Sequence, residues 1–213
     1  MTGIVQTPPP RVPPQVQLGG RAVRAGEGPG VLSPPTVTPM KFSRWALYGV
    51  IGLRLALGFE FLWAFLDKTF GLGYATPSAR AWINGGSPTS GFLAGANVGP
   101  FQGIFRSLSG IAAMDWLFMV GLLGIGVALI FGVAVRIGAV SGALMLFLMY
   151  LAVWVSATTA GGQPSGSTNP IVDEHIIGIL GLVVVGALAN RGTGYVGRTW
   201  AALPIVRTNP WLR

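Results

Sequence analysis

The chain has 213 residues, of which 51% are hydrophobic and only 9% are charged. This composition is too apolar for an ordinary soluble domain and indicates that lipid is the solvent of a large part of the chain. The absence of cysteine excludes disulfides, thiolate nucleophiles and cysteine-ligated iron–sulfur clusters. The formal net charge of +8 does not indicate nucleic-acid binding, because the basic residues lie beside apolar segments rather than in clusters, and anionic membrane lipid is the simpler partner.

Residues 1–41 are rich in proline, with the stretches PPPRVPPQ and VLSPPTVTP. They contain neither the apolar region nor the cleavage site of a secretory signal. Such a composition cannot bury enough apolar surface to fold, so it predicts a disordered cytoplasmic tail. The membrane domain is expected to begin at residue 42.

Four apolar segments follow, each close to the roughly 20 residues that a helix needs to cross a bilayer. They predict an all-α fold, a polytopic membrane four-helix bundle over residues 42–192, followed by a cytoplasmic carboxyl-terminal tail over residues 193–213. The predicted spans are 44–66, 114–134, 136–157 and 172–190.

The lysine and arginine residues are distributed unequally between the two ends of these spans. Only Lys68, Arg80 and Arg106 lie at the outer end. The tails and the turn between the second and third spans hold Arg11, Arg21, Arg24, Lys41, Arg44, Arg136, Arg191, Arg198, Arg207 and Arg213. Because positively charged loops stay in the cytoplasm, both termini are expected to be cytoplasmic and the 67–113 and 158–171 loops to be external.

The loop between the first two spans is far longer than a helix–helix connection needs and is expected to contain short helices of its own. Ser78 is placed to cap one that carries Arg80 and Trp82, and Pro100 is placed to begin another. In the second helix, apolar residues recur at helical spacing opposite polar ones, which predicts a helix lying in the membrane interface. These apolar residues are Phe101, Ile104, Phe105, Leu108 and Ile111.

Between these two helices, the sequence Asn84-Gly85-Gly86-Ser87-Pro88 predicts a tight turn. The two glycines permit positive φ and bring backbone amides close to a bound group, which makes the turn a candidate anion site. The alternative is a plain turn that connects two interfacial helices.

A charged stripe runs along the first span. Arg54 falls near the middle of the span, where an isolated cation is costly, so it is expected to face the bundle and either pair with a polar group or fix the helix register. Glu60, Trp63 and Asp67 follow toward the outer end, where offsets of three and seven residues place them on one helix face. The stripe leads from the bilayer to the outer surface.

The fourth predicted span opens with the sequence NPIVDEH, which contains the only histidine of the chain, His175. Asn169 and Pro170 end the loop. Asp173 and Glu174 fall in the first helical turn, where carboxylates act either as helix caps or as functional groups. A lone histidine excludes a bis-histidine haem held within the chain, and no metal site is predicted.

The depths of two titratable residues suggest a common site. The helical rise places Glu60 roughly 9 Å and His175 roughly 5 Å below the outer membrane boundary. The two are expected to share one outer-leaflet cavity, in which His175, beside its two carboxylates, is suited to carry protons. The tryptophans are mostly explained by the aromatic belt of membrane interfaces.

Two stretches resemble the DoxX/DoxD family of four-helix membrane proteins. One runs from Arg54 to Leu93 and contains RLALGFEFLWAFLDKTFGLGYATP and AWINGGSPTSGFL, which is similar to the large membrane subunit of thiosulfate:quinone oxidoreductase. The other is NPIVDEH. With the pattern of spans, the resemblance covers about residues 42–192. It implies a bundle in the plasma membrane, oxidation of thiosulfate to tetrathionate with quinone as electron acceptor, and a small DoxA-like partner subunit.

For such a reaction the sequence offers three groups of candidate residues. Proton donors and relays, the catalytic candidates, are His175, Glu60, Asp173 and Glu174. Candidates for binding a dianionic sulfur substrate are Arg54, Lys68, Asp67, Arg80, Trp82, Asn84, Gly85, Gly86 and Arg106. Trp63 and Asn169 are candidates for a quinone pocket. No cofactor other than quinone is expected in this chain.

Two other functions remain open. A non-catalytic membrane anchor or accessory subunit of a respiratory complex would use the charged stripe for packing alone and the amino-terminal tail for partner contact. It would co-purify with larger subunits. A small-solute transporter is less favoured, because the spans show neither an inverted repeat nor discontinuous helices at the midplane.

Overall fold

The computed structural model describes residues 43–189 and 195–212. The predicted amino-terminal tail lies outside the described residues, as do Arg11, Arg21, Arg24, Lys41, Arg191 and Arg213 of the orientation argument. Within the described residues the regular structure is helical, with two isolated β-bridges and no strand. An all-α fold is therefore confirmed for this part of the chain.

Three helices are long and apolar enough to cross a membrane: α1 (Arg44–Phe70), α4 (Ala112–Phe131) and α5 (Val135–Val153). Their ends agree with those of the first three predicted spans to within about four residues, because sustained hydropathy locates such helices approximately. Local caps refine them: the Ser43 hydroxyl accepts a bond from the Ala46 amide, and Gly71 ends α1 with a positive φ. A membrane protein with several spans follows from these lengths.

The fourth predicted span corresponds to a shorter apolar helix, α6 (Glu174–Ala187), of 14 residues. It begins where the Asp173 side chain caps the helix and ends at Leu188, before the segment 190–194 that lies outside the described residues. A rise of about 1.5 Å per residue gives it a length of about 21 Å. By length, three helices rather than four in the described part of the chain meet the requirement for crossing a membrane.

Glycines allow α1 and α4 to pack closely. A Cβ added to Gly58 would lie 2.9 Å from the Ile130 side chain, and one added to Gly126 would lie 2.8 Å from the backbone nitrogen of Leu62. The two helices run antiparallel with little space between their backbones. The core beneath them consists of Leu57, Phe61, Met119, Leu122, Ile125, Leu129, Val135, Ala139, Leu146, Leu182, Val185 and Ala189.

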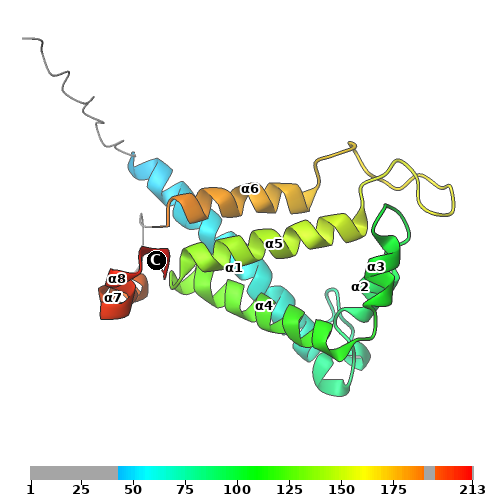
Figure 1. Ribbon diagram of the computed structural model, residues 1–213, viewed down its shortest axis with the longest axis horizontal. Coiled ribbons are helices and arrows are strands. Elements are labelled where there is room, and N and C mark those ends of the chain that lie inside the picture. The colour runs from blue at the N-terminus through cyan, green and yellow to red at the C-terminus, as the bar shows by residue number, and fades with distance from the viewer. Residues whose placement is uncertain (1–42, 190–194, 213) are drawn as a thin grey trace, which may run out of the picture. The chain divides into compact units, whose positions relative to one another are not determined.

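The helices α4 and α5 are joined by a tight turn in which Gly132 and Ala134 both have positive φ. From this turn the two helices diverge, so that α5 runs beside α6 while α4 packs against α1 (Figure 1). Two short helices of the long loop, α2 (Ser90–Ala94) and α3 (Gln102–Ser107), lie at the open end of this divergence (Figure 1). The opening between α4 and α5 is therefore closed at one end by the loop.

The loop between α1 and α4 also contains two single 3₁₀ turns, η1 (Ser78–Arg80) and η2 (Trp82–Asn84). Ser78 lies in the first, but its side chain makes no capping bond. The helix predicted after Pro100 is shorter than expected, because Gly110 takes a φ of 80° and Ile111 is extended, which ends the helical segment before α4.

The described part of the carboxyl-terminal tail forms α7 (Tyr195–Ala202), α8 (Pro204–Thr208) and η3 (Pro210–Leu212). The indole of Trp200 donates to the Leu212 carbonyl at 2.8 Å, which holds the segment in a compact fold. Arg136, at the start of α5, donates to the Pro210 carbonyl at 3.0 Å. The tail therefore lies against the end of the bundle that carries the α4–α5 turn.

Candidate functional site

A largely apolar cavity of about 500 Å³ lies between α4 and α5, and we call it the α4–α5 cavity. The loop helices α2 and α3 close one end of it with Phe92, Leu93, Phe105 and Leu108. Along its length it is lined by α4 residues Met114, Leu117, Phe118, Val120, Gly121 and Ile125 and by α5 residues Ser141, Leu144, Met145, Leu148 and Met149. Many of these side chains are exposed, so the cavity opens toward the surroundings of the bundle.

Lys68 is the only charged residue that lines the α4–α5 cavity. Its side chain is half-buried near the carboxyl-terminal end of α1, and Pro88 and Thr89 of the loop lie at the same cavity. A single ammonium group in apolar surroundings can fix the orientation of a ligand that has one polar end. Lys68 was predicted from the sequence to contact a dianionic substrate, but its apolar surroundings were not predicted.

A second cavity, of about 460 Å³, lies along α1 and is called the α1 cavity here. It brings together four of the predicted site residues, Glu60, Trp63, Asp67 and Lys68, with the aromatic residues Phe59 and Tyr74 and with Ala56, Ala64 and Ala75. Lys68 lines both cavities, so its side chain borders each of them. Neither cavity is lined by His175 or Asn169.

Asp67 has a structural task within the α1 cavity. Its carboxylate is buried, with 2% of the residue exposed, and accepts the backbone amides of Tyr74 at 3.2 Å and Ala75 at 3.1 Å. These bonds hold the turn that follows α1 against the helix. Each oxygen of Asp67 thereby accepts one backbone bond, whereas both oxygens of Glu60 in the same cavity are free of hydrogen bonds to the described residues.

Asp115, at the start of α4, fastens the glycine-rich turn to the bundle. Its Oδ1 accepts bonds from the Thr89 hydroxyl at 2.6 Å, the Thr89 amide at 2.9 Å and the Ser87 hydroxyl at 2.9 Å. Asp115 and Thr89 are both buried. Asp115 was not among the residues predicted for the site. The available signal was an acid at the first turn of an apolar span that follows a loop with a Ser/Thr-containing turn.

The predicted anion site at Gly85 and Gly86 has no free backbone donor. The Gly85 amide donates to the Trp82 carbonyl and the Gly86 amide to the Ala81 carbonyl, each at 3.0 Å. A Cβ on Gly86 would lie 2.1 Å from the Arg80 carbonyl oxygen, so glycine serves a close backbone approach. These contacts agree with the alternative of a plain tight turn.

The other predicted loop residues are dispersed. Asn84 donates to the Ser78 carbonyl at 2.9 Å, and Trp82 packs edge to face against Trp116 with ring centroids 4.7 Å apart. Arg80 and Arg106 are exposed and line neither cavity. The loop therefore presents its two arginines to the surroundings, and does not gather them around one pocket.

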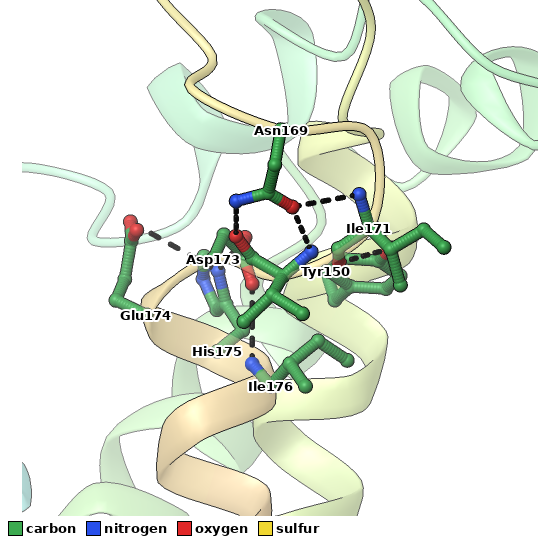
Figure 2. A network of polar contacts seen from close by, with 8 residues as sticks. Tyr150, Asn169, Ile171, Asp173, Glu174, His175 and Ile176 are labelled. Atoms are coloured by element: carbon green, nitrogen blue, oxygen red, sulfur yellow. Dashed lines mark hydrogen bonds and ion pairs between the residues drawn. The ribbon is translucent and has the colours of Figure 1, made fainter.

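His175 lies in a polar network at the start of α6 (Figure 2). Its Nδ1 lies 2.7 Å from Asp173 Oδ2, while Asp173 Oδ1 accepts the Ile176 amide at 3.1 Å. The helix-cap interpretation of Asp173 is thus confirmed. Glu174 is exposed, with its carboxylate 4.0 Å from the imidazole.

Asn169 holds the loop that precedes this network (Figure 2). Its side-chain oxygen accepts the amides of Ile171 and Val172, and its side-chain nitrogen donates to the Val172 carbonyl at 2.6 Å. The Tyr150 hydroxyl of α5 donates to the Ile171 carbonyl at 2.9 Å. Asn169 therefore orders the entry to α6, and the expected sharing of one cavity by His175 and Glu60 is not observed.

Within the described residues, Asp173, Glu174 and His175 form a group whose potential metal-ligand atoms lie within 4.8 Å of one another. Asp173 is already committed to the cap and to the imidazole, and Glu174 is exposed. Capping explains this geometry without a metal.

We expect Asp173→Ala to lower the free energy of unfolding by about 1 kcal/mol, because the substitution removes the helix cap. Chemical unfolding in mild detergent, followed by circular dichroism, measures this effect. Glu174→Ala is the matched control: it removes an exposed carboxylate from the same helical turn and should cost only about 0.3 kcal/mol. Equal effects of the two substitutions would contradict the assignment of the cap.

Arg54 is buried, and its Nε is the one fully buried side-chain polar atom in the described residues that lacks a hydrogen-bond partner. Its Nη1 would lie 3.1 Å from a Cβ added to Gly132, the residue that ends α4. Leu188 and Ala189, at the end of α6, border the same small void. The guanidinium therefore lies at the carboxyl-terminal ends of two helices, whose dipoles favour a cation, and it borders neither larger cavity.

Comparisons with protein-family models, with curated proteins and with solved structures found no match to this chain. The resemblance to the DoxX/DoxD family therefore stays a prediction that rests on the sequence motifs.

Proposed function

We propose that this protein is the membrane component of a quinone-linked oxidoreductase and that the quinone binds in the α4–α5 cavity. The observation that carries the proposal is an apolar cavity of about 500 Å³ with one ammonium group, that of Lys68, in its lining. Ligand sites of this size are typically apolar with a few polar groups that fix orientation. A quinone has the matching form: an apolar tail, a flat ring and polar carbonyl oxygens.

The chemistry assigns Lys68 the role of donor to a quinone carbonyl oxygen. Reduction to the quinol takes two electrons and two protons, and negative charge develops on the carbonyl oxygens as electrons arrive. A charge-assisted hydrogen bond from an ammonium group strengthens with that charge, most of all in apolar surroundings. This role replaces the one that the sequence analysis gave to His175, which lines neither cavity.

The remaining lining residues suit the ring and the apolar tail of a quinone. Phe92 and Phe105, near the Lys68 end, supply aromatic faces, while the exposed side chains of Leu117, Val120 and Leu144 leave the cavity open along the helices. In a bilayer this opening faces hydrocarbon, so an isoprenoid tail could enter from the lipid without crossing water.

The electron donor in this proposal is external and is suggested by the family resemblance. Two thiosulfate ions lose two electrons and join through a new sulfur–sulfur bond as tetrathionate, and the quinone takes up those electrons with two protons. Arg80 and Arg106, exposed on the loop, would attract such a dianion. Because the chain has no cysteine, the electrons pass directly from donor to quinone or through a DoxA-like partner subunit.

We expect Lys68→Met to weaken the binding of a short-chain quinone roughly tenfold, because a charge-assisted hydrogen bond is lost. Thiosulfate-dependent quinone reduction should fall with it. Quinone binding to the purified protein in nanodiscs, followed by tryptophan fluorescence, measures the first effect. Lys68→Arg should keep most of the affinity, and Arg207→Met, which removes an exposed cation of α8, is the control. Equal affinity of wild type and Lys68→Met would rule out this site.

A non-catalytic membrane subunit is the second candidate, and one feature of α1 favours it. Gly49 and Gly52 have no atom of a neighbouring element within 4 Å of an added Cβ, and Trp45 and Tyr48 beside them are exposed. Small residues on an uncovered membrane helix suit contact with a partner helix. On this proposal the wild-type protein co-purifies with larger subunits, and the Gly52→Leu variant does not. Neither the wild type nor the variant binds quinone.

A further inference from the structure

Glu60 is a carboxylate without a counterion in this fold. It is exposed on α1, among Ala56, Phe59, Trp63 and Ala64 of the α1 cavity. Across the described residues, no basic nitrogen lies within 4.0 Å of its oxygens, since the ion pairs found there involve only His175. An unpaired carboxylate on the apolar face of a membrane helix is costly, so such residues usually mark a binding partner.

Three aromatic rings line the same cavity. Phe59 stacks on Trp63 with ring centroids 5.7 Å apart, and Tyr74 meets Trp63 edge to face at 5.1 Å. Phe59 and Tyr74 are largely exposed, 58% and 78% respectively, so their outer surfaces are not covered by the bundle. Electron-rich ring faces beside a carboxylate attract a cation, above all one whose charge is spread over alkyl groups.

The other two charges of the cavity largely offset each other. Asp67 is buried, accepts two backbone amides and adjoins Lys68 in the chain. With Asp67 and Lys68 as a neutral pair, Glu60 leaves the α1 cavity with one net negative charge. This sign disfavours a dianion such as thiosulfate and favours a monovalent cation.

We propose that the α1 cavity binds an organic cation of the quaternary ammonium class, with Glu60 as counterion and Phe59, Trp63 and Tyr74 as its aromatic wall. A divalent metal ion fits less well, because hard cations require several oxygen ligands and Glu60 is the one carboxylate here whose oxygens do not already hold the backbone of the following turn. The proposal does not require quinone binding, because Glu60 and the three rings line the α1 cavity and not the α4–α5 cavity. Both a choline lipid headgroup and a free quaternary ammonium solute have the required chemistry.

The test uses the full chain in nanodiscs of phosphatidylglycerol, which contain no choline. Isothermal titration with choline chloride, against sodium chloride at equal ionic strength, should give saturable binding to the wild type. Glu60→Gln and Trp63→Leu should each weaken that binding roughly tenfold. Two controls should leave it unchanged: Glu27→Gln, which makes the same charge change in the amino-terminal tail, and Phe70→Leu, an exposed ring at the end of α1 that does not line the cavity.

The source of the cation is distinguished by a second lipid composition. In nanodiscs of phosphatidylcholine, loss of the choline signal identifies the lipid headgroup as the occupant, whereas an undiminished signal identifies a free solute. The proposal is overturned if choline gives no saturable binding in phosphatidylglycerol, or if Glu60→Gln binds as tightly as the wild type. A partner helix found cross-linked over Glu60 would overturn it as well.

Discussion

Asp115→Ala should detach the glycine-rich turn from α4 and lower the free energy of unfolding by about 3 kcal/mol. One carboxylate oxygen accepts three hydrogen bonds there, from two hydroxyls and one backbone amide. Removing it leaves the buried Thr89 donors without partners, and the cost of such unsatisfied groups exceeds that of a simple truncation. The helices that close the α4–α5 cavity follow directly after this turn, so the cavity should lose its end wall.

Limited trypsin digestion of the protein in nanodiscs measures the detachment. Cleavage after Arg106, on α3, should accelerate in Asp115→Ala and accelerate less in Asp115→Asn, whose side-chain carbonyl can still accept. Ser107→Ala is the control, because its hydroxyl bonds only to Ile104 within the same short helix. Unchanged cleavage in Asp115→Ala would show that packing, and not this network, holds the loop.

Gly126→Leu should separate α1 from α4 and destabilise the bundle by about 3 kcal/mol. An added Cβ at this position would lie 2.8 Å from the Leu62 backbone nitrogen and 3.0 Å from its Cα. Backbone atoms cannot turn aside as a side-chain end can, so the whole helix must move. Because the core lies between these helices, the shift should also expose Leu122 and Ile125.

Gly124→Leu, on the same helix, provides a matched control, since a Cβ added there would have no atom of a neighbouring helix within 4 Å. Thermal unfolding in detergent should show a markedly lower midpoint for Gly126→Leu and little change for Gly124→Leu. Similar midpoints for the two variants would mean that α1 and α4 do not pack as closely as described.

The first three spans were predictable because hydropathy is a property of the local sequence. The ends of α1 illustrate the limit of that signal: the apolar run stops near residue 66, whereas the helix continues to Phe70 because Gly71 caps it and Asp67 holds the following turn. In the fourth segment the predicted span began at residue 172, and the Asp173 cap moves the start of the helix to Glu174. Capping residues and side-chain hydrogen bonds thus determine helix ends that hydropathy locates only approximately.

The two cavities could not be predicted from the sequence, because they depend on how helices diverge. Glu60, Trp63 and Asp67 were predicted to lie on one face of the first span, and they line the same cavity; Lys68, which lies there too, was not predicted to join them. The contribution of Phe92 and Phe105 to the α4–α5 cavity comes from a loop folded back across α4 and α5. The spacing of apolar residues in the loop does not predict that contact.

His175 was predicted to share a cavity with Glu60 because the two residues lie at similar depths in the membrane. Depth alone does not determine which way a side chain points from its helix. In the structure the imidazole is turned to Asp173 on its own helix, whereas Glu60 faces outward from α1. Arg54 illustrates a related limit. Its surroundings are the ends of α4 and α6, and those ends could be located only after the helices had been packed.

The unequal lengths of the helices have a consequence for the bilayer itself. A hydrocarbon core about 30 Å thick is exceeded by α1, whose 27 residues extend about 40 Å, but not reached by α6. Because α1 runs obliquely to α6 (Figure 1), a tilt of α1 in the bilayer would absorb this excess. If α6 crosses the same bilayer, its hydrophobic length falls short of the core, and the lipid beside it would have to thin, which would bring headgroups and water toward His175.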